Sequence, residues 1–452
     1  MALCNLFLSL LILFSLSNTI VGHEIKIHGP GLQPKNIVMP ARYFFVNFTT
    51  FNEKTYSTEL ASKFAVEISG KSFINSHCRI WINTLDRKDG TFIVRYKLYE
   101  TCSNLVISIY YKNKHIHNSP YKFEGPIQPD QCNCPQEDLD TWLANYECPK
   151  SYDQVENDLK PFKNVQISTE IDKIIEKYHK PESISFCHYV IKENLIHRDC
   201  YGKHVGFNMF ADNILLSLTR KVIIPDMELV INLGDWPLIH KRSELLPIFS
   251  WCGSDGTNDI VMPTYDITES TLENMGRVTI DTLSVQGSIE YKWRDRENRA
   301  FWRGRDSRAE RLQLIDIAHK HPDLINASLT NFFFFRDKEA EYGPKQPHIS
   351  FFKFFDYKYQ INIDGTVAAY RFPYLLSGGG LVLKQDSSYY EHFYKQLKPW
   401  EHYIPIKGDL SDLEWSKRNT GEVNVREGMT HVPQPKFDCH CDTKYYKDHE
   451  EL

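Results

Sequence analysis

The chain has 452 residues, which is enough for two or three domains. Apolar residues make up 42% and charged residues 25%, both ordinary for a globular protein. The formal net charge of −5 gives no reason to expect nucleic acid as a partner.

The two ends of the chain carry targeting features. Leu6–Leu16 is an apolar stretch too short to span a bilayer, and it is typical of a signal peptide covering residues 1–22. No later segment is apolar for about 18 residues, so we expect no membrane span in the mature chain. The last four residues, His449–Leu452, resemble a K-D-E-L retrieval signal. Together these features predict residence in the lumen of the endoplasmic reticulum.

Cysteine usage points to the same compartment. Of 11 cysteines, only Cys4 lies in the signal segment, and the even remainder predicts a disulfide framework whose pairing the sequence does not give. In the pairs Cys132/Cys134 and Cys439/Cys441, one residue separates the two cysteines. Paired zinc ligands are usually separated by two to four residues, which disfavours a zinc site. Zinc remains the alternative for a set of candidate ligands, Cys132, Cys134, Cys148, Cys439, His440 and Cys441. Two sequons, at Asn47 and Asn326, are candidate glycan sites.

Residues 24–125 are predicted to form a β-sandwich. The segment GTFIVRYKLYE follows the turn DRKDG (86–90), and its side chains alternate between two faces with the period of a strand. One face, which is expected to point into the core, carries Phe92, Val94, Tyr96 and Leu98. Ile93, Arg95 and Lys97 then lie on the opposite face. This turn and strand are preceded by Gly29–Leu32 and followed by Ser119-Pro120. Motifs in this order resemble a filamin-type immunoglobulin-like repeat. Such repeats bind partners, so the resemblance implies a spacer or docking module.

Residues 126–155 form a linker rich in Pro and Cys, and a mixed α/β domain is expected over 156–452. Asp138-Leu139-Asp140 matches the D-x-D of metal-dependent glycosyltransferases, but it lies among Gln, Glu and Pro, so we discount it. Further on, an amphipathic helix is predicted to begin at Ser168. Apolar strands then alternate with helices, which predicts parallel sheets, with room for two sheets and a cleft between them.

The segment FWRGRDSRAER (301–311) contains four arginines where a predicted strand gives way to a helix. Ser307 and Glu310 have the spacing of a capping box. The free N–H groups of a helix start, together with Arg305 and Arg311, suit a diphosphate. A solvated basic turn paired with neighbouring carboxylates is the alternative.

Two further segments place functional groups near predicted strand ends. INIDGTVAAYRFPYLLSGGGLVLKQ (361–385) combines a small-residue loop, Arg371 at a helix start and a glycine loop, as in the nucleotide-binding half of a doubly wound fold. In INLGDWPLI (231–239), Asp235 follows an apolar strand, at the edge where ligands bind in open α/β sheets. A carboxylate there can take the proton of an acceptor hydroxyl, although a turn role fits the local pattern equally well.

These blocks resemble the CAP10-type glycosyltransferases of family 90. Two further segments carry the same resemblance, PIFSWCGSDGTNDIVMPTYD and VLKQDSSYYEHFYKQLKPWEHYIPI. They are most similar to the KDEL motif-containing protein O-glucosyltransferases, which also combine a signal peptide, a filamin-like repeat and a retrieval tail. The resemblance implies an inverting GT-B enzyme with two Rossmann-like lobes. It would transfer glucose, or xylose less readily, from a UDP-sugar to serine of folded EGF-like repeats, as in Notch or fibrillin.

The resemblance also implies roles for individual residues. Asp235 would be the catalytic base, and Arg305 and Arg311 would contact UDP. More UDP contacts would come from the following loop: Thr366, Val367, Ala368, Ala369, Tyr370 and Arg371. No metal and no other cofactor is implied, so arginines would offset the diphosphate charge.

The chain departs from the family pattern after about residue 413. Relatives continue with further helix there, whereas here the sequence passes directly to EWSKRNTGEVNVREGM. Loss of that helix would expose apolar surface of both lobes. The alternative hypothesis is therefore a catalytically impaired binding protein of the lumen that acts through its filamin-like domain.

Overall fold

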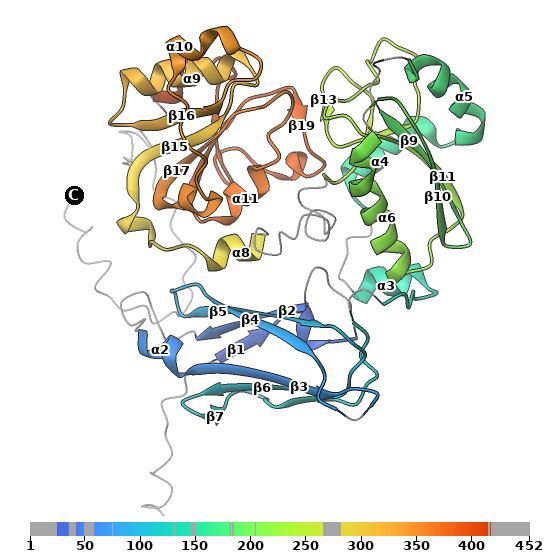
Figure 1. Cartoon of the computed structure of the whole chain (residues 1–452), viewed down its shortest axis with the longest axis vertical. Helices are drawn as coiled ribbons and strands as arrows, with labels where there is room; N and C mark the ends of the chain where they lie inside the picture. The colour runs from blue at the N-terminus through green and yellow to red at the C-terminus, as the bar shows by residue number, and fades with distance from the viewer. Residues whose placement is uncertain are drawn as a thin grey trace, which may run out of the picture.

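The computed structural model describes most of the chain between residues 25 and 416. The described ranges are 25–35, 42–48, 58–74, 76–129, 132–145, 151–180, 182, 185–203, 205–264, 282–414 and 416. The predicted signal peptide, the retrieval-like tail and the segment where helix is expected to be missing lie outside these ranges. Figure 1 shows an N-terminal β-sandwich below two α/β units.

The N-terminal domain is β-rich, as the sequence predicts. One antiparallel sheet has the order β1-β2-β5-β4, formed by Ile25–His28, Arg42–Phe48, Thr91–Leu98 and Ile80–Asp86. The second sheet consists of β3 (Phe64–Lys71), β6 (Ser103–Tyr111), β7 (Lys114–His115) and β8 (Tyr121–Phe123). The predicted inner face of β5 is fully buried, and Cys78 forms a disulfide with Cys102. The short helices here are η1 (Pro30–Leu32) and α2 (Thr58–Lys63).

Much of the outer face of β5 is buried too, which the alternation alone does not predict, whereas Lys97 on this face stays half-buried. Ile93 and Arg95 are 0% and 4% exposed. The helix α8 (Thr282–Gly287), which leads into the second α/β unit, packs against β4 and β5 (Figure 1). The sandwich is therefore in direct contact with the rest of the protein through this helix.

The first α/β unit is built on a five-stranded sheet with the order β10-β9-β11-β12-β14. Its strands are Leu195–Tyr201, Phe186–Lys192, Met227–Asn232, Ile248–Ser250 and Ile260–Val261. The pairs β11–β12 and β12–β14 are parallel, whereas β10, β9 and β11 pair antiparallel, and a disulfide joins Cys187 to Cys200. The helices are α3 (Leu139–Asn145), α4 (Asp153–Leu159), η2 (Lys160–Phe162), α5 (Ile167–Tyr178), η3 (Val205–Phe207) and α6 (Asn208–Lys221). Ser168 is therefore inside α5, and the expectation that it opens the helix is wrong.

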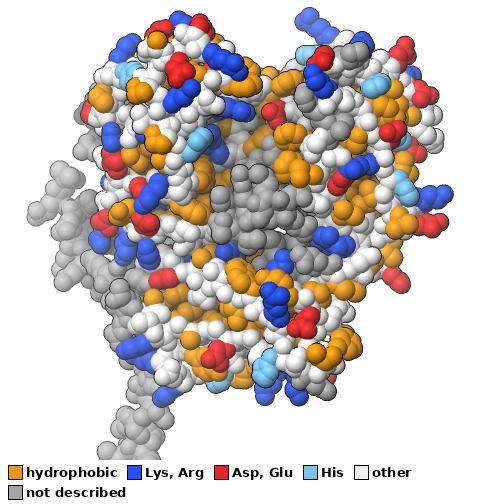
Figure 2. All heavy atoms as spheres, viewed as in Figure 1, with side chains coloured by type: hydrophobic (Ala, Val, Ile, Leu, Met, Phe, Trp, Pro, Cys, Tyr) orange, Lys and Arg blue, Asp and Glu red, His pale blue; other side chains and the backbone are white. Residues whose placement is uncertain are grey.

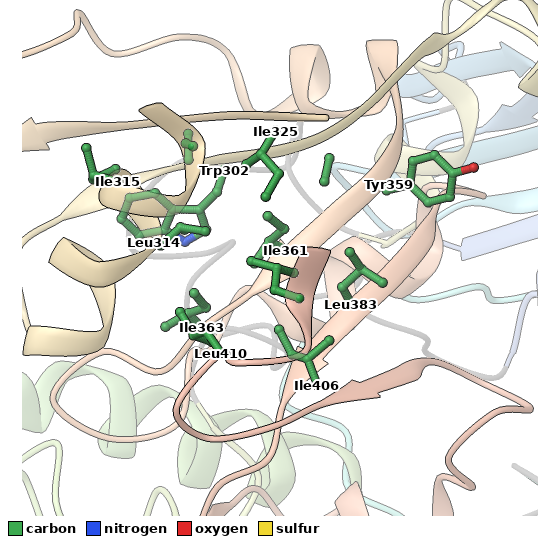
Figure 3. Packing of buried hydrophobic residues seen from close by; sticks show 14 of the residues in the cluster. Trp302, Leu314, Ile315, Ile325, Tyr359, Ile361, Ile363, Leu383, Ile406 and Leu410 are labelled. Carbon is green, nitrogen blue, oxygen red and sulfur yellow. The ribbon is translucent and has the colours of Figure 1, made fainter. Parts of the chain in front are cut away.

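The second α/β unit contains a fully parallel sheet with the order β16-β15-β17-β18-β20. Its strands are Ile325–Asn331, Glu297–Arg305, Tyr357–Asn362, Leu381–Gln385 and Ile404–Ile406. The helices are η5 (Trp293–Asp295), α9 (Ala309–Lys320), η6 (Arg336–Lys338), α10 (Glu339–Tyr342), η7 (Phe351–Asp356), α11 (Phe372–Ser377) and η8 (Tyr394–Gln396). Trp302, Leu314 and Ile361 belong to the apolar core between the sheet and α9 (Figure 3).

Main-chain contacts join the two units. β13 (Gly253–Ser254) of the first pairs antiparallel with β19 (Tyr389–Tyr390) of the second. A Cβ on Gly253 would lie 2.7 Å from side-chain atoms of Val261 and Tyr390, so close pairing requires glycine here. Figure 2 shows the surface hollowed between the units, with Lys and Arg side chains on the β15 side. Within the described ranges, no helix has the length and apolarity needed to cross a membrane.

Candidate active site

Asp235 lies in a tight turn immediately beyond β11, and Asn232 shapes that turn. The fully buried Asn232 donates from Nδ2 to the carbonyl of Trp236 at 2.8 Å and to Oγ of Ser250 at 3.0 Å. Its Oδ1 accepts the N–H of Gly234 at 2.8 Å. These bonds satisfy a buried amide and fix the turn that presents Asp235.

A second buried side chain holds the segment after the turn. The Asp259 carboxylate accepts the N–H groups of Leu238 and Ile239, both at 2.8 Å, and the hydroxyl of Ser250 at 2.7 Å. Sequence reasoning missed both Asn232 and Asp259. Asn232 could have been found, because it is a polar residue inside the apolar run LVINL, where a buried amide must find hydrogen-bond partners. Asp259 follows the polar stretch SDGTN and gave no comparable signal.

The Asp235 carboxyl has a mixed electrostatic environment. Burial raises the pKa of Asp235, and the positive charge of Arg305 across the hollow opposes part of that rise. The main-chain carbonyl of Asp235 accepts a hydrogen bond from the Tyr370 hydroxyl at 3.2 Å and one from the Cys252 thiol at 3.3 Å. A half-buried carboxylate with these properties can act as a general base.

Arg305 and Arg371 line one pocket of about 570 Å³ at the end of β15. This volume lies within the range of about 300–1,000 Å³ that small-molecule sites usually have. Arg371 immediately precedes α11 and donates from Nη1 to the carbonyl of Arg303 at 2.6 Å. Arg303 and His348 also line the pocket, and the Arg303 guanidinium is hydrogen-bonded to the Trp302 carbonyl and to the carbonyl and Oδ1 of Asn326. The structure thus brings Arg305 and Arg371 together from segments far apart in the sequence.

Arg311 has a different environment from the other two. It is 4% exposed and donates to the carbonyls of Asp364 at 2.7 Å, Arg305 at 2.8 Å and Ile363 at 3.2 Å. Burial lowers the pKa of Arg311 to about 9. Because its donors are used by main-chain carbonyls, Arg311 holds the Arg305 end of β15 against the loop after β17.

The loop 366–371 extends from the second unit to the first. Val367 and Ala368 are buried against Cys252, and Tyr370 packs on the apolar cluster around β9 and β11. Thr366 is half-buried, and the carbonyl of the buried Ala369 accepts the N–H of Phe372 at 3.1 Å, at the start of α11. Of the six loop residues predicted to contact UDP, only Arg371 lines the arginine pocket. The loop therefore connects that pocket to the Asp235 turn.

The segment between β15 and α9 differs from the predicted capping box. α9 begins at Ala309 after Arg308, with no side-chain cap hydrogen bond, so Ser307 does not cap it. The hydroxyl of Ser307 accepts from Arg311 at 3.3 Å, and Glu310 forms an ion pair with Arg308 at 3.0 Å. The N-cap position is Arg308, one residue later than the capping box predicts.

A third buried carboxylate, Asp364, stands behind the loop. Its side chain accepts the hydroxyl of Ser387 and lies 3.8 Å from Nη1 of Arg308. Burial raises the pKa of Asp364, and the Ser387 hydrogen bond opposes the rise. Its main-chain N–H donates to Oε1 of Gln385 at 3.0 Å, so Asp364 connects the end of β17 to β18, and it is not among the residues that line the arginine pocket.

The metal and glycan candidates are placed as follows. Within the described ranges, no group of three or more His, Cys, Asp or Glu side chains is arranged to hold a metal. Asp138 of the D-x-D accepts the N–H and hydroxyl of Thr141 at the start of α3. The Sγ atoms of Cys132 and Cys134 lie 3.2 Å apart.

The side-chain amide of Asn326, a candidate glycan site, is hydrogen-bonded within the protein to Arg303 at 2.7 Å and to Tyr357 at 2.9 Å. These bonds disfavour glycosylation there.

Comparison with known proteins identifies the class. The model of glycosyl transferase family 90 matches residues 144–428, and the Filamin/ABP280 repeat model matches residues 21–122. The chain therefore belongs to glycosyltransferase family 90 and carries an N-terminal filamin-type repeat.

Individual relatives extend this finding. The chain is 44% identical to Protein O-glucosyltransferase 2 of Danio rerio, over 93% of this chain and 93% of the relative. It is 44% identical to Protein O-glucosyltransferase 3 of Homo sapiens, over 89% of this chain and 81% of the relative. Protein O-glucosyltransferase 1 of Homo sapiens is 28% identical, over 60% of this chain and 71% of the relative. That match covers less of the chain than the other two do.

Proposed function

We propose that this protein is a protein O-glucosyltransferase that moves glucose from UDP-glucose to a serine of a folded EGF-like repeat, with inversion. The two α/β units then correspond to the two Rossmann-like lobes of a GT-B enzyme. EGF-repeat proteins such as Notch or fibrillin are acceptors of the expected kind, and UDP-xylose is a secondary donor. The signal peptide and the tail His449–Leu452 support residence in the lumen of the endoplasmic reticulum.

One observation carries the proposal: the Asp235 carbonyl is hydrogen-bonded to Tyr370, and the next residue, Arg371, lines one pocket with Arg305 at the end of β15. Ligands bind at the carboxyl ends of parallel strands in open α/β folds. A carboxylate on one side and guanidinium groups on the other are the two charges that glycosyl transfer from a diphosphate requires.

The reaction follows from these two groups. The serine oxygen attacks the anomeric carbon from the face opposite UDP, and its proton passes to the carboxylate of Asp235. The bond from the anomeric carbon to the β-phosphate oxygen breaks, and its electron pair leaves with UDP. Arg305 and Arg371 lie in one pocket, where they stabilise the added negative charge. In-line attack on one face and departure from the other inverts the anomeric centre.

The chain's own cations suit a donor bound without a metal ion. Arg305 and Arg371 line a pocket large enough for a nucleotide sugar, whereas the Arg303 guanidinium beside them is engaged by Asn326. Guanidinium groups bind phosphate oxygens with two hydrogen bonds each. We assign Arg311 a supporting role, because it fixes the backbone that carries Arg305. Thr366–Tyr370 would contact the donor from the loop side.

The decisive experiment combines Asp235→Asn with a donor-binding measurement. Transfer from UDP-glucose to a folded EGF repeat, followed by mass spectrometry, should fall at least about a hundredfold, the size expected for loss of a general base. UDP affinity should stay close to that of the unmodified chain. Asp323→Asn, an exposed carboxylate in the second unit, is the matched control and should leave transfer unchanged. Near-normal transfer by Asp235→Asn would reject the assignment of the base.

The same assay tests the alternative hypothesis, a lumenal binding protein that acts through the filamin-like domain. UDP binding without transfer by the unmodified chain would support that alternative. UDP binding together with the mass gain of one hexose on the EGF repeat supports the transferase.

A further inference from the structure

We propose that Phe333 and Phe334, at the rim of the arginine pocket, form an acceptor-recognition surface that contacts the folded protein substrate. The proposal rests on the proposed transferase function and goes beyond it, because it assigns acceptor recognition to residues that play no part in donor binding. The partner is a folded EGF-like domain that carries the acceptor serine.

The aromatic pair is held by an unusually complete set of hydrogen bonds. The carboxylate of Asp306, which is 0% exposed, accepts the main-chain N–H groups of Phe333 at 2.7 Å, Phe334 at 2.9 Å and Phe335 at 2.6 Å. Burying a carboxylate is costly unless it is fully hydrogen-bonded, and three N–H donors meet that need. Asp306 follows Arg305 directly in the chain. The turn is therefore fixed relative to the arginine that faces the base.

The two rings are exposed, although their neighbours in the run are not. Phe333 and Phe334 are 53% and 51% exposed, whereas Phe332 is 5% exposed and Phe335 packs against the core. The exposed rings meet edge to face with centroids 5.1 Å apart. Large aromatic side chains that stay exposed in a rigid turn are typical of binding surfaces, where they supply much of the affinity.

The pair lies beside the reaction site. Asn331 is the register partner of Arg305 in the β15–β16 pairing and lines the arginine pocket. Phe333 follows two residues later, so its main chain is within about 7 Å of the pocket wall. Ile349, which is 40% exposed, lines the same pocket. A folded domain that presents a hydroxyl between this pocket and Asp235 is therefore within reach of the aromatic pair.

The first α/β unit offers a matching apolar group. Trp236 directly follows Asp235 and is 43% exposed. Exposed apolar side chains of both units thus lie beside Asp235 and Arg305. This arrangement favours a compact protein domain over a free sugar as the acceptor. The Arg336 guanidinium lies 5.5 Å from the centroid of Phe333, which favours a partner with a carboxylate beside its apolar contact.

The test replaces both rings at once, as Phe333→Ser with Phe334→Ser. Steady-state transfer from UDP-glucose to a folded EGF repeat should show a KM for the acceptor raised by at least about tenfold, as for loss of an interface hot spot. The kcat and the affinity for UDP should not change. The control is Phe73→Ser, an 86% exposed phenylalanine in the filamin-type domain, which should leave the acceptor KM as it was.

The outcomes separate this inference from the function on which it rests. If the unmodified chain binds UDP but transfers nothing to any EGF repeat, the proposed function fails and this inference with it. If the unmodified chain transfers and the double variant has the same acceptor KM, only the aromatic surface is rejected. Slow hydrolysis of UDP-glucose without acceptor should be equal in both chains, and a loss of it would assign the effect to misfolding and overturn the proposal.

Discussion

The hydroxyl of Tyr370 donates a hydrogen bond of 3.2 Å to the main-chain carbonyl of Asp235. Tyr370 belongs to the loop that precedes Arg371 in the second α/β unit, whereas Asp235 lies in the turn beyond β11 of the first. The Cys252 thiol donates to the same carbonyl at 3.3 Å and packs against Val367 of that loop. One set of contacts therefore positions both the proposed base and the loop next to the arginine pocket.

Tyr370→Phe should lower transfer without unfolding the protein. The ring still packs on the first unit, but the hydrogen bond is lost, at a cost of about 0.5–1.5 kcal/mol. If that bond orients Asp235 in the transition state, kcat/KM falls roughly two- to tenfold. Steady-state kinetics with an EGF repeat measure the change. Tyr342→Phe, which removes a remote hydroxyl bonded to Asp316 at 3.2 Å, is the control and should have no effect on kcat/KM.

The pH dependence of transfer should report Asp235. A base acts only when deprotonated, and burial raises the pKa of Asp235, so activity should fall with decreasing pH at values above the ordinary carboxyl pKa of about 3.9. Arg305 lowers that pKa, so Arg305→Met should move the acid limb of kcat/KM to higher pH. The exposed Arg294 provides the control Arg294→Met. An acid limb that stays in place, or moves to lower pH, in Arg305→Met would contradict the assignment.

The sequence located the proposed site because its main features are local. Asp235 follows an apolar strand, Arg305 ends β15, and Arg371 immediately precedes a helix. Strand and helix boundaries alone therefore place each residue near the carboxyl ends of the strands in its own unit. Alternation likewise identified the inner face of β5. These patterns depend on neighbours within a few residues.

Other features depend on segments far apart in the chain. Arg311 lies in the same basic segment as Arg305, yet it is buried because the carbonyls of Ile363 and Asp364 fold back over it. Composition and spacing do not reveal which arginine of a cluster will be covered. Arg95 occupies the predicted outer face of a strand, but α8 covers that face. Both outcomes follow from tertiary packing that overrides a local pattern.

Arg311→Met should act on stability more than on donor binding. The variant leaves three buried carbonyls without their donor, and each such loss costs about 1–3 kcal/mol. We expect a loss of several kcal/mol in the free energy of unfolding of the catalytic domain, measured by denaturant titration. Arg305→Met, whose side chain lines the pocket, should instead weaken UDP binding with little effect on stability. Equal stability of the two variants would show that Arg311 is not structural.

The filamin-type domain should influence the catalytic domain through α8. Nη1 of the buried Arg95 donates to Oγ of Ser284 in α8 at 2.9 Å. A Cβ on Gly287 would lie 2.4 Å from Cβ of Leu85 in β4, so this residue allows the helix to approach the sandwich. α8 also packs against α11, which starts directly after Arg371. A displaced α8 therefore disturbs the helix that directly follows Arg371 of the arginine pocket.

Gly287→Val should force α8 away from β4 and raise the Kd for UDP by at least about threefold, a change of roughly 0.7 kcal/mol that calorimetric titration resolves. Ser284→Ala removes only the hydrogen bond to Arg95 and should act in the same direction with a smaller effect. Gly206→Val is the control, because nothing lies within 4 Å of a Cβ at that position. If Gly287→Val binds UDP as tightly as the control, the sandwich contact has no influence on the donor pocket, and the domain acts only as the docking module that its sequence suggests.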